Sequence, residues 1–249
     1  MSEIQAVFLD DGGVLNNNEL RAPQWQKLIA QYFAPRYGGN HNAWKKANRI
    51  AFENLLKSWK KAKKKPELDF QTFWQNESEL WITTMFHQVG VAPPPLHEQY
   101  NVAIKAEEWI TPRVRAAFPG VIQTVRLLKE RGYSLYTASG GTSWQLRGYL
   151  TGMGIADYFE EFYGADLINT MKASSLFYKR MFRHAGISPE QALVVDDFPE
   201  NVLRAREEGA TGVLVTTSEN ENLENLFYSI TRIDSLPNII DKIIHEANK

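Results

Sequence analysis

The stretch Val7-Phe8-Leu9-Asp10-Asp11-Gly12-Gly13-Val14-Leu15 decides the fold that we expect for this chain of 249 residues. Together with Ala6, its first three residues form a short apolar run, which is typical of a strand buried on both faces of a sheet. The run stops at two aspartates and two glycines, and such residues mark a turn directly after a strand. We therefore expect a buried strand that presents Asp10 at its carboxyl end.

Two further apolar runs end in the same way. Residues 134–138 stop at Ser139-Gly140-Gly141, and residues 192–195 stop at Asp196-Asp197. Helical spacing and a last strand complete the pattern, with helices predicted over 121–130, 144–153, 175–184 and 201–208 and the strand over 212–215. Strands that alternate with helices predict an α/β fold, with a Rossmann-like parallel sheet covered on both faces.

Residues 18–111 differ in character from the rest of the chain. They show helical spacing almost throughout, with breaks at Pro66 and at residues 93–95, and they contain six of the seven tryptophans. We predict an inserted all-helical domain over 18–111 and an α/β core made of 1–17 and 112–249. The tryptophans are expected to form the core of this small helical unit, although such an aromatic-rich insert could also serve a substrate or a partner.

The composition excludes several classes of function. The formal net charge of −1 provides no global attraction for nucleic acid or for an anionic membrane. The absence of cysteine excludes disulfides, thiol catalysis and cysteine metal sites. No apolar run approaches the roughly 20 residues of a membrane span, and the N-terminus does not have the pattern of a signal peptide. We therefore expect a cytoplasmic protein without nucleic-acid or membrane partners.

Polar groups follow three of the predicted strands: Asp10, Ser139 and the pair Asp196-Asp197. A single Asp or Ser in this place usually caps a helix or forms a turn. Ligands, however, bind beyond the carboxyl ends of parallel strands, and these three ends together carry the groups that phosphoryl transfer needs. A carboxylate can attack phosphorus, Mg²⁺ can be held by carboxylates and phosphate oxygens, and a hydroxyl can hold the transferred oxygens.

At these positions the chain resembles the haloacid dehalogenase superfamily, through four motifs in the family's order. The quoted stretch after the first strand matches the first motif, and Ser139 matches the second. Lys172, which precedes a predicted helix ending at Gly186, matches the third, and residues 194–201 match the fourth. The predicted insert lies where the family places a helical, C1-type cap. The resemblance implies a HAD-like fold and phosphatase-like hydrolase activity.

The resemblance also implies the metal site. Asp10 corresponds to the family nucleophile and to a Mg²⁺ ligand, and the backbone carbonyl of Gly12 corresponds to a second ligand. Asp197, together with Asp196, would complete the protein's share of the ligands. The expected substrate is a small phosphorylated metabolite, hydrolysed through an aspartyl-phosphate.

Other residues are expected around the phosphate. Ser139 and the amide of Gly140 would bind its oxygens, and Lys172 would neutralise charge on the nucleophile and the phosphate. Asn201 could hold Lys172, support the metal ligands, or simply begin a helix. Asp11 is a further residue that could lie behind the metal ligands, although it should point away from Asp10 because adjacent residues leaving a strand face opposite sides.

One departure from the family pattern concerns the second acid. Family phosphatases usually carry an Asp two residues after the nucleophile, where this chain has Gly12. General acid–base catalysis contributes about 10²–10⁴-fold, so its loss should slow the hydrolysis of alkyl phosphates. Three explanations stay open: another group, such as His41 of the cap, or a water supplies the proton; the leaving group needs none, as with an aryl or acyl phosphate; or the protein is a weak enzyme that only binds a phosphorylated ligand.

Two alternatives to a phosphatase follow from the same motifs. A 2-haloacid-type dehalogenase would use the attacking Asp10 without the second acid, but halide displacement needs no metal-binding pair such as Asp196-Asp197. A HAD-like protein that binds a phospholigand or a protein partner would have no need of an intact Asp10. Both residue patterns favour the phosphatase.

Overall fold

The structure, a computed structural model, describes residues 4–65, 68–216 and 228–247. A six-stranded sheet forms its centre, in the order β3-β2-β1-β4-β5-β6, and every neighbouring pair is parallel. The strands are β1 (Ala6–Leu9), β2 (Ser134–Ala138), β3 (Phe159–Tyr163), β4 (Ala192–Asp196), β5 (Thr211–Val215) and β6 (Tyr228–Ile230). This arrangement confirms the predicted α/β fold with a Rossmann-like parallel sheet.

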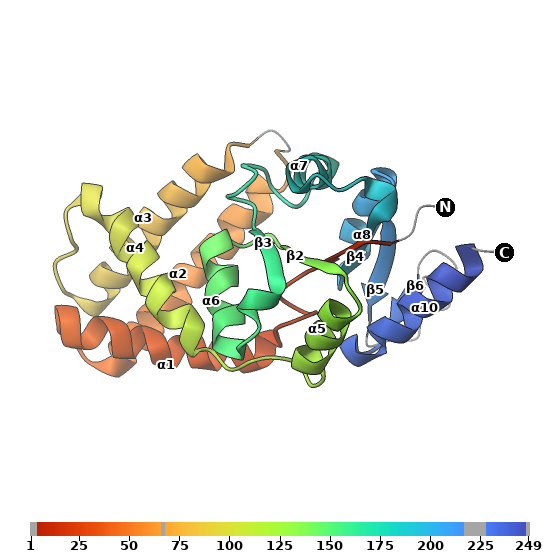
Figure 1. Cartoon of the computed structure of the whole chain (residues 1–249). Helices are drawn as coiled ribbons and strands as arrows, with labels where there is room; N and C mark the ends of the chain where they lie inside the picture. The colour runs from red at the N-terminus through yellow and green to blue at the C-terminus, as the bar shows by residue number, and fades with distance from the viewer. Residues whose placement is uncertain (1–3, 66–67, 217–227, 248–249) are drawn as a thin grey trace.

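The strand order places the predicted site at the centre of the sheet. The chain first builds outward from β1 to β2 and β3, and then crosses to the other side of β1 to form β4, β5 and β6 (Figure 1). In register, Leu9 lies beside Thr137 of β2 and beside Val195 of β4. The carboxyl ends of these three strands therefore meet where the strand order reverses, which is the usual ligand position in such sheets.

Helices cover both faces because successive side chains of β1 point in opposite directions. Val7 and Leu9 join a hydrophobic cluster with α5 (Val121–Glu130), α6 (Ser143–Met153) and α10 (Leu236–Ala247). Ala6 and Phe8 face the other way, toward α7 (Ser175–Ala185) and α8 (Pro199–Glu207). The ring of Phe8 stacks on Tyr136 with centroids 4.7 Å apart. All four residues of β1 are fully buried, as the apolar run predicts.

Four long helices follow β1 and lie together at one side of the molecule (Figure 1). They are α1 (Asn18–Tyr37), α2 (His41–Ala62), α3 (Phe70–Val89) and α4 (Leu96–Ile110). Their shared core includes Phe33, whose ring lies 5.0 Å from that of Trp44 and 6.0 Å from that of Phe86. This confirms the expected helical character of the segment, while its division from the core as a separate domain stays a prediction.

Among the described strands and α-helices, β3, β6 and α10 lie outside the sequence-based prediction. Among the residues that the structure describes, these two strands form the edges of the sheet. β3 reads Phe-Glu-Glu-Phe-Tyr and has an exposed Glu160, so it does not show the continuous apolar run of the central strands. Edge strands are half solvated, and apolar periodicity is therefore a weak signal for them.

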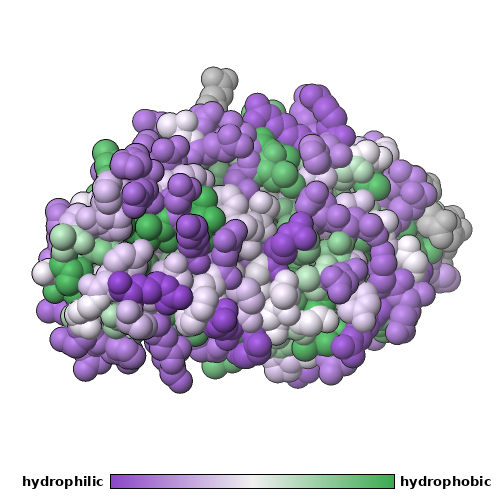
Figure 2. Space-filling view, turned by 60° about the vertical axis from the view of Figure 1, so that its left-hand side comes forward, coloured by the Kyte–Doolittle hydropathy of each residue, from purple (hydrophilic) through white to green (hydrophobic). Residues whose placement is uncertain are grey.

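The surface is mainly hydrophilic on the face shown in Figure 2, where hydrophobic residues form small separate patches. Within residues 4–65, 68–216 and 228–247, no helix combines the length and apolar character that a membrane span requires.

Candidate active site

A cavity of about 850 Å³ opens at the carboxyl edge of the sheet. The core contributes Asp10, Ser139 and Lys172 to its wall, and the helices α1–α4 contribute mainly aromatic and polar side chains. Seven of the nine site residues predicted from the sequence line this cavity: Asp10, Asp11, Gly12, Ser139, Gly140, Lys172 and Asn201. Asp197 is not among the lining residues, although its carboxylate lies close to those of Asp10 and Asp196. Asp196 lies just behind it, in contact with Lys172.

Asp10 follows β1 directly and is fixed by the neighbouring strand, because its backbone N–H donates to the carbonyl of Val195 at 3.0 Å. Its side chain is buried, and one carboxylate oxygen accepts a hydrogen bond from Lys172 Nζ at 2.7 Å. Burial raises the pKa of Asp10 to about 7, although the charge of Lys172 opposes this rise. A nucleophilic carboxylate at this position consequently depends on nearby positive charge to stay ionised.

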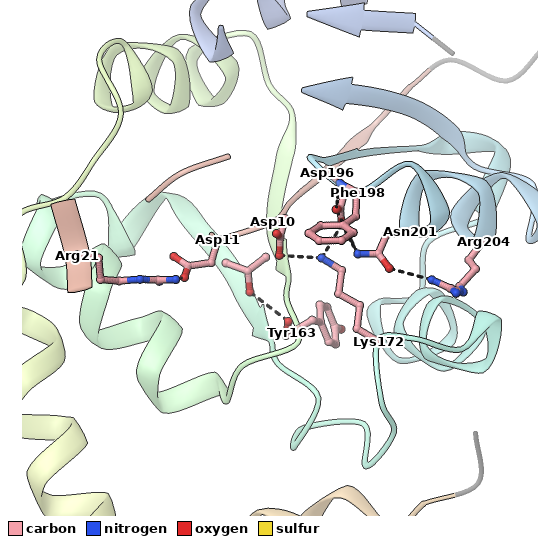
Figure 3. Close-up of polar contacts among 10 residues, drawn as sticks. Asp10, Asp11, Arg21, Tyr163, Lys172, Asp196, Phe198, Asn201 and Arg204 are labelled. Atoms are coloured by element: carbon pink, nitrogen blue, oxygen red, sulfur yellow. Dashed lines mark hydrogen bonds and ion pairs between the residues drawn. The ribbon is translucent and has the colours of Figure 1, made fainter. Parts of the chain in front are cut away.

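Lys172 lies between two carboxylates. Its Nζ is 2.7 Å from Asp10 Oδ1 and 2.6 Å from Asp196 Oδ2 (Figure 3). Burial opposes the charge of this lysine, but Asp10 and Asp196 outweigh that effect and raise its pKa. The residue precedes α7, which ends at Gly186 with a φ of 67°, as the motif spacing predicts. Lys172 therefore joins the ends of β1 and β4 as a permanent cation.

Asp196 is fully buried at the end of β4 and is held from several directions. Its Oδ1 accepts the backbone N–H of Phe198 at 2.8 Å and the side-chain amide of Asn201 at 3.2 Å. Asn201 in turn accepts a hydrogen bond from Arg204 at 3.0 Å. Of the three roles considered for Asn201, the structure supports the one in which its side chain, from the first turn of α8, holds the acidic residue Asp196.

The third carboxylate, Asp197, makes the cluster fit a divalent cation. One oxygen each of Asp10, Asp196 and Asp197 lies within 4.8 Å of the others. Asp197 Oδ1 is buried and has no hydrogen-bond partner among the described residues. Burial, reinforced by Asp196, raises the pKa of Asp197 to about 6. Three carboxylates around a single lysine are under-compensated, and a buried unpaired carboxylate oxygen is costly, so a hard cation such as Mg²⁺ suits this donor set.

Gly13 makes room for Asp197. Its φ of +94° lies in the left-handed region, and a Cβ on it would come 2.1 Å from Asp197 Oδ2. The turn closes through the carbonyl of Asp11, which accepts the N–H groups of Leu15 at 2.9 Å and Asn16 at 2.7 Å. Two separate features thus require glycine at position 13: the backbone conformation and the close approach of the Asp197 side chain.

Ser139 and Gly140 follow β2 at the same edge. The Ser139 N–H donates to the carbonyl of Tyr163 at 2.9 Å, which anchors the start of the loop to β3. The side chain of Ser139 is buried, and both residues line the cavity. Their position beside the end of β1 suits the predicted contact with phosphoryl oxygens.

Asp11 points away from Lys172, as the alternation along a strand predicts (Figure 3). Its carboxylate accepts a hydrogen bond from Asn16 Nδ2 at 2.5 Å and forms an ion pair with Arg21 of α1. These contacts lie outside the Asp10–Lys172–Asp196 group, so the structure gives Asp11 a role in holding α1 rather than one behind the metal ligands.

Two residues of the cavity wall carried no motif and were missed by sequence reasoning. Arg21 reaches the end of β1 from the first turn of α1, where nothing in the sequence marks it. Glu107 on α4 is buried, and its two oxygens accept hydrogen bonds from Trp144 Nε1 at 2.7 Å and Gln145 Nε2 at 2.8 Å. Burial raises its pKa to about 7. The available signal was its spacing from Ala103 and Ile110, which puts an acid on the apolar face of α4.

The helical segment contributes mainly aromatic and polar residues to the cavity. His41 is exposed at the start of α2 and is not among the residues lining the cavity, so the structure does not support it as the missing acid. The tryptophans divide between the core role that we expected and the alternative of lining a ligand site. Trp44 is fully buried in that core, but four other tryptophans line the cavity, namely Trp25, Trp59, Trp74 and Trp81.

Comparison with known proteins agrees with this geometry. A family model described as haloacid dehalogenase-like hydrolase matches residues 4–209. A phosphoglycolate phosphatase from Nitrosococcus oceani is 30% identical over 132 residues, which is 53% of this chain and 56% of that protein. The chain therefore matches little more than half the length of this curated relative.

Solved structures share the fold at low sequence identity. A HAD phosphatase from Thermococcus onnurineus is 18% identical, with a TM-score of 0.60 over 95% of this chain and 98% of that one. The L-2-haloacid dehalogenase from Xanthobacter autotrophicus with chloropropionic acid covalently bound is also 18% identical, with a TM-score of 0.60 over 96% and 98%. Phosphatases and dehalogenases resemble the chain equally in fold, so only the site can separate them.

Proposed function

Because the chain belongs to the haloacid dehalogenase-like hydrolase family, we propose that it is a Mg²⁺-dependent phosphatase acting on a small phosphorylated metabolite. The observation that carries this proposal is the group of three carboxylates, Asp10, Asp196 and Asp197, around the single cation of Lys172. A cluster with this excess of negative charge suits a reaction that brings together a cation and an anionic phosphate.

In the proposed reaction Asp10 attacks phosphorus, and the bond from phosphorus to the ester oxygen breaks. Lys172 holds the attacking carboxylate and shields it from the negative charge of the phosphate. Ser139 and the amide of Gly140 hold the phosphoryl oxygens. Water then attacks the aspartyl-phosphate, which releases inorganic phosphate and restores Asp10.

A bound Mg²⁺ would supply charge neutralisation between nucleophile and phosphate. Asp10, Asp196, Asp197 and the carbonyl of Gly12 would hold it. Asn201 keeps Asp196 in place through its side-chain amide, and Gly13 leaves space for Asp197. The same cation would keep Asp10 ionised despite burial, which otherwise raises the pKa of this carboxyl to about 7.

Dehalogenation is the second candidate, and the observation in its favour is Gly12, which provides no acid beside the nucleophile. Displacement of a halide requires no metal, however. In such an enzyme the buried Asp197 Oδ1 would remain without a partner among the described residues, at a cost in stability. The phosphatase gives this oxygen a function, and we therefore prefer it.

The test compares release of 4-nitrophenol from 4-nitrophenyl phosphate with release of chloride from 2-chloropropionate, each with Mg²⁺ and with a chelator. We expect phosphate ester hydrolysis that the chelator abolishes and no halide release. Asp10→Asn should lower turnover by about 10³-fold or more, because the attacking group is lost. Asp157→Asn, a change at an exposed aspartate, serves as the control. Chelator-resistant halide release, or full turnover in the Asp10→Asn variant, would contradict the proposal.

A further inference from the structure

The space beside Gly12 is occupied by groups that cannot act as an acid. A Cβ built on Gly12 would lie 2.9 Å from Arg21 Nη2 and 3.0 Å from Asn18 Oδ1. Both side chains belong to the first turn of α1. A side chain at position 12 would therefore require the ends of these two side chains to shift. In this structure the space beside Gly12, where family phosphatases carry the second acid, therefore holds the guanidinium of Arg21.

Arg21 is held firmly in that position. It pairs with Asp11, donates to Asn18, and its guanidinium carbon lies 5.1 Å from the centre of the Tyr149 ring. The Tyr149 hydroxyl in turn accepts a hydrogen bond from Trp25 Nε1 at 2.7 Å. An arginine remains protonated throughout the range in which proteins are folded, so it can donate hydrogen bonds to an oxyanion but cannot deliver a proton to it.

The wall that the helical segment contributes is aromatic. Trp59 and Trp74 both line the cavity and meet edge to face, with ring centroids 5.9 Å apart. Trp74 is only 7% exposed, and its Nε1 has no hydrogen-bond partner among the described residues. An aromatic wall of this kind suits the flat face of an aromatic ring on a ligand. The volume of about 850 Å³ is far more than a phosphate alone requires.

We propose that the substrate is an aryl phosphate monoester, whose aromatic ring lies among the tryptophans and whose phenolic oxygen leaves toward Arg21. This inference rests on the proposed phosphatase function and identifies its leaving group. Asp10 forms the new bond to phosphorus, and the bond from phosphorus to the phenolic oxygen breaks. Its electron pair stays on that oxygen as a phenolate, which later takes a proton from solvent.

The chemistry of the leaving group explains why no acid is needed. A phenolic hydroxyl has a pKa near 10, whereas water, and with it a simple alcohol, lies near 16. A phenolate is thus a far better leaving group than an alkoxide, and a hydrogen bond from a fixed cation stabilises it further. Glu107 is the remaining buried acid of the cavity wall, but both of its oxygens already face N–H donors on α6.

The first experiment measures kcat/KM of the Mg²⁺-loaded wild type for phenyl phosphates with different ring substituents and for glycerol 2-phosphate. We expect a steep rise with falling pKa of the phenol, and a preference for phenyl phosphate over glycerol 2-phosphate of about 10²-fold or more. Rates within tenfold for the aryl and alkyl esters would overturn the inference while leaving the phosphatase intact. No hydrolysis of any ester would instead contradict the phosphatase itself.

Variants then distinguish the roles of Arg21 and Glu107 toward the leaving group. Arg21→Met should slow aryl esters by about tenfold or more, and most strongly those with the poorest leaving groups. The double change Gly12→Asp with Arg21→Ala makes space for an acid and should raise glycerol 2-phosphate hydrolysis relative to phenyl phosphate. Glu107→Gln should leave the dependence on the leaving group unchanged. A selective loss of alkyl ester hydrolysis in Glu107→Gln would show Glu107 to be the acid and would overturn the inference.

Binding provides a readout that does not depend on turnover. Tryptophan fluorescence can follow the binding of phenylphosphonate and methylphosphonate, and we expect the phenyl compound to bind about tenfold more tightly. Trp74→Leu should abolish this preference. Trp109→Leu is the matched control, because Trp109 is not among the cavity-lining residues. Equal affinity for the two phosphonates, or an equal effect of the two substitutions, would contradict an aryl site.

Discussion

Two ion pairs, one buried and one partly buried, lie on opposite sides of the end of β1, and they differ in how charge is balanced (Figure 3). On one side Lys172 serves both Asp10 and Asp196, with Asp197 close by. On the other side Arg21 pairs with Asp11 alone. Consecutive aspartates thus bind different cations, because residues leaving a strand face opposite ways.

This difference in charge balance gives the two sides different roles: the Lys172 side suits the reaction, and the Arg21 side suits recognition of the ligand. The Lys172 side carries three carboxylates against one cation, so it can accept a divalent metal and a phosphate. The Arg21 side is balanced one to one, so it offers hydrogen bonds and shape rather than a place for a metal. The first side is built from strand ends of the core, and the second depends on α1 packing against the turn after β1.

Lys172→Met gives the largest expected effect on the first side of this comparison. Removing the cation leaves Asp10 and Asp196 buried without their shared partner. We expect kcat to fall by about 10²-fold or more, and the free energy of unfolding to fall by about 3–5 kcal/mol in the absence of metal. Steady-state kinetics and urea denaturation measure the two quantities. Lys179→Met, at an exposed lysine of the following helix α7, should change neither.

Gly13→Ala should have a smaller effect than Lys172→Met, and it should act on the affinity for Mg²⁺. The new methyl group collides with Asp197 Oδ2, and the left-handed φ of +94° adds strain. We expect the Mg²⁺ concentration for half-maximal activity to rise by about tenfold or more. Gly132→Ala is a matched control, because Gly132 has a φ of +88° and no atom within 4 Å of an added Cβ. Both variants should lose about 1–2 kcal/mol of stability. A shared loss of metal affinity would show that strain, and not Asp197, is responsible.

Glu107 extends the comparison of the two ion pairs, because it is a buried carboxyl held by two N–H donors. Burial raises its pKa to about 7 in the folded protein, from an ordinary value of 4.5. Between these values the folded state binds more protons than the unfolded state. The free energy of unfolding should therefore decrease as the pH rises from about 4.5 to 7, by roughly 2–4 kcal/mol from this group.

The Glu107→Gln variant tests this dependence. In this variant the glutamine amide NH₂ faces one of the two N–H donors that Glu107 accepts from, and this costs the same stability at every pH. The glutamine side chain does not titrate. Urea denaturation of wild type and variant at pH 5.0 and 7.5, without metal, should show a difference between them that shrinks toward the higher pH. Asp10 and Asp197 titrate in both proteins and cancel in the comparison. Parallel pH profiles would show that Glu107 is ionised in the folded state throughout this range.

Much of the core could be predicted because its signals are local. The central strands β1, β2 and β4 are continuous apolar runs, since both of their faces are covered, and each ends at the polar groups that the structure brings to one edge. Lys172 contacts Asp10 from 162 positions away, and the order of motifs was sufficient to pair them. The edge strands β3 and β6 could not be predicted in the same way, because half-solvated strands carry no such run.

The helical side of the cavity had no comparable signal. The spacing of apolar residues predicted helices α1–α4, but spacing does not tell which tryptophan faces its own unit and which faces the sheet. Arg21 is an ordinary arginine in a first helical turn until α1 packs beside Gly12. Glu107 stood out only as an acid on an apolar face.

The amino-acid sequence by itself determined the sheet, the polar strand ends and the nucleophile with its lysine, because burial and turns leave their pattern in neighbouring residues. Only the tertiary structure decided that Arg21 lies beside Gly12, that Asp197 lies over Gly13, and that Trp74 lines the cavity. Those relations arise where segments distant along the chain pack together, and such packing produces no periodic pattern in the local sequence.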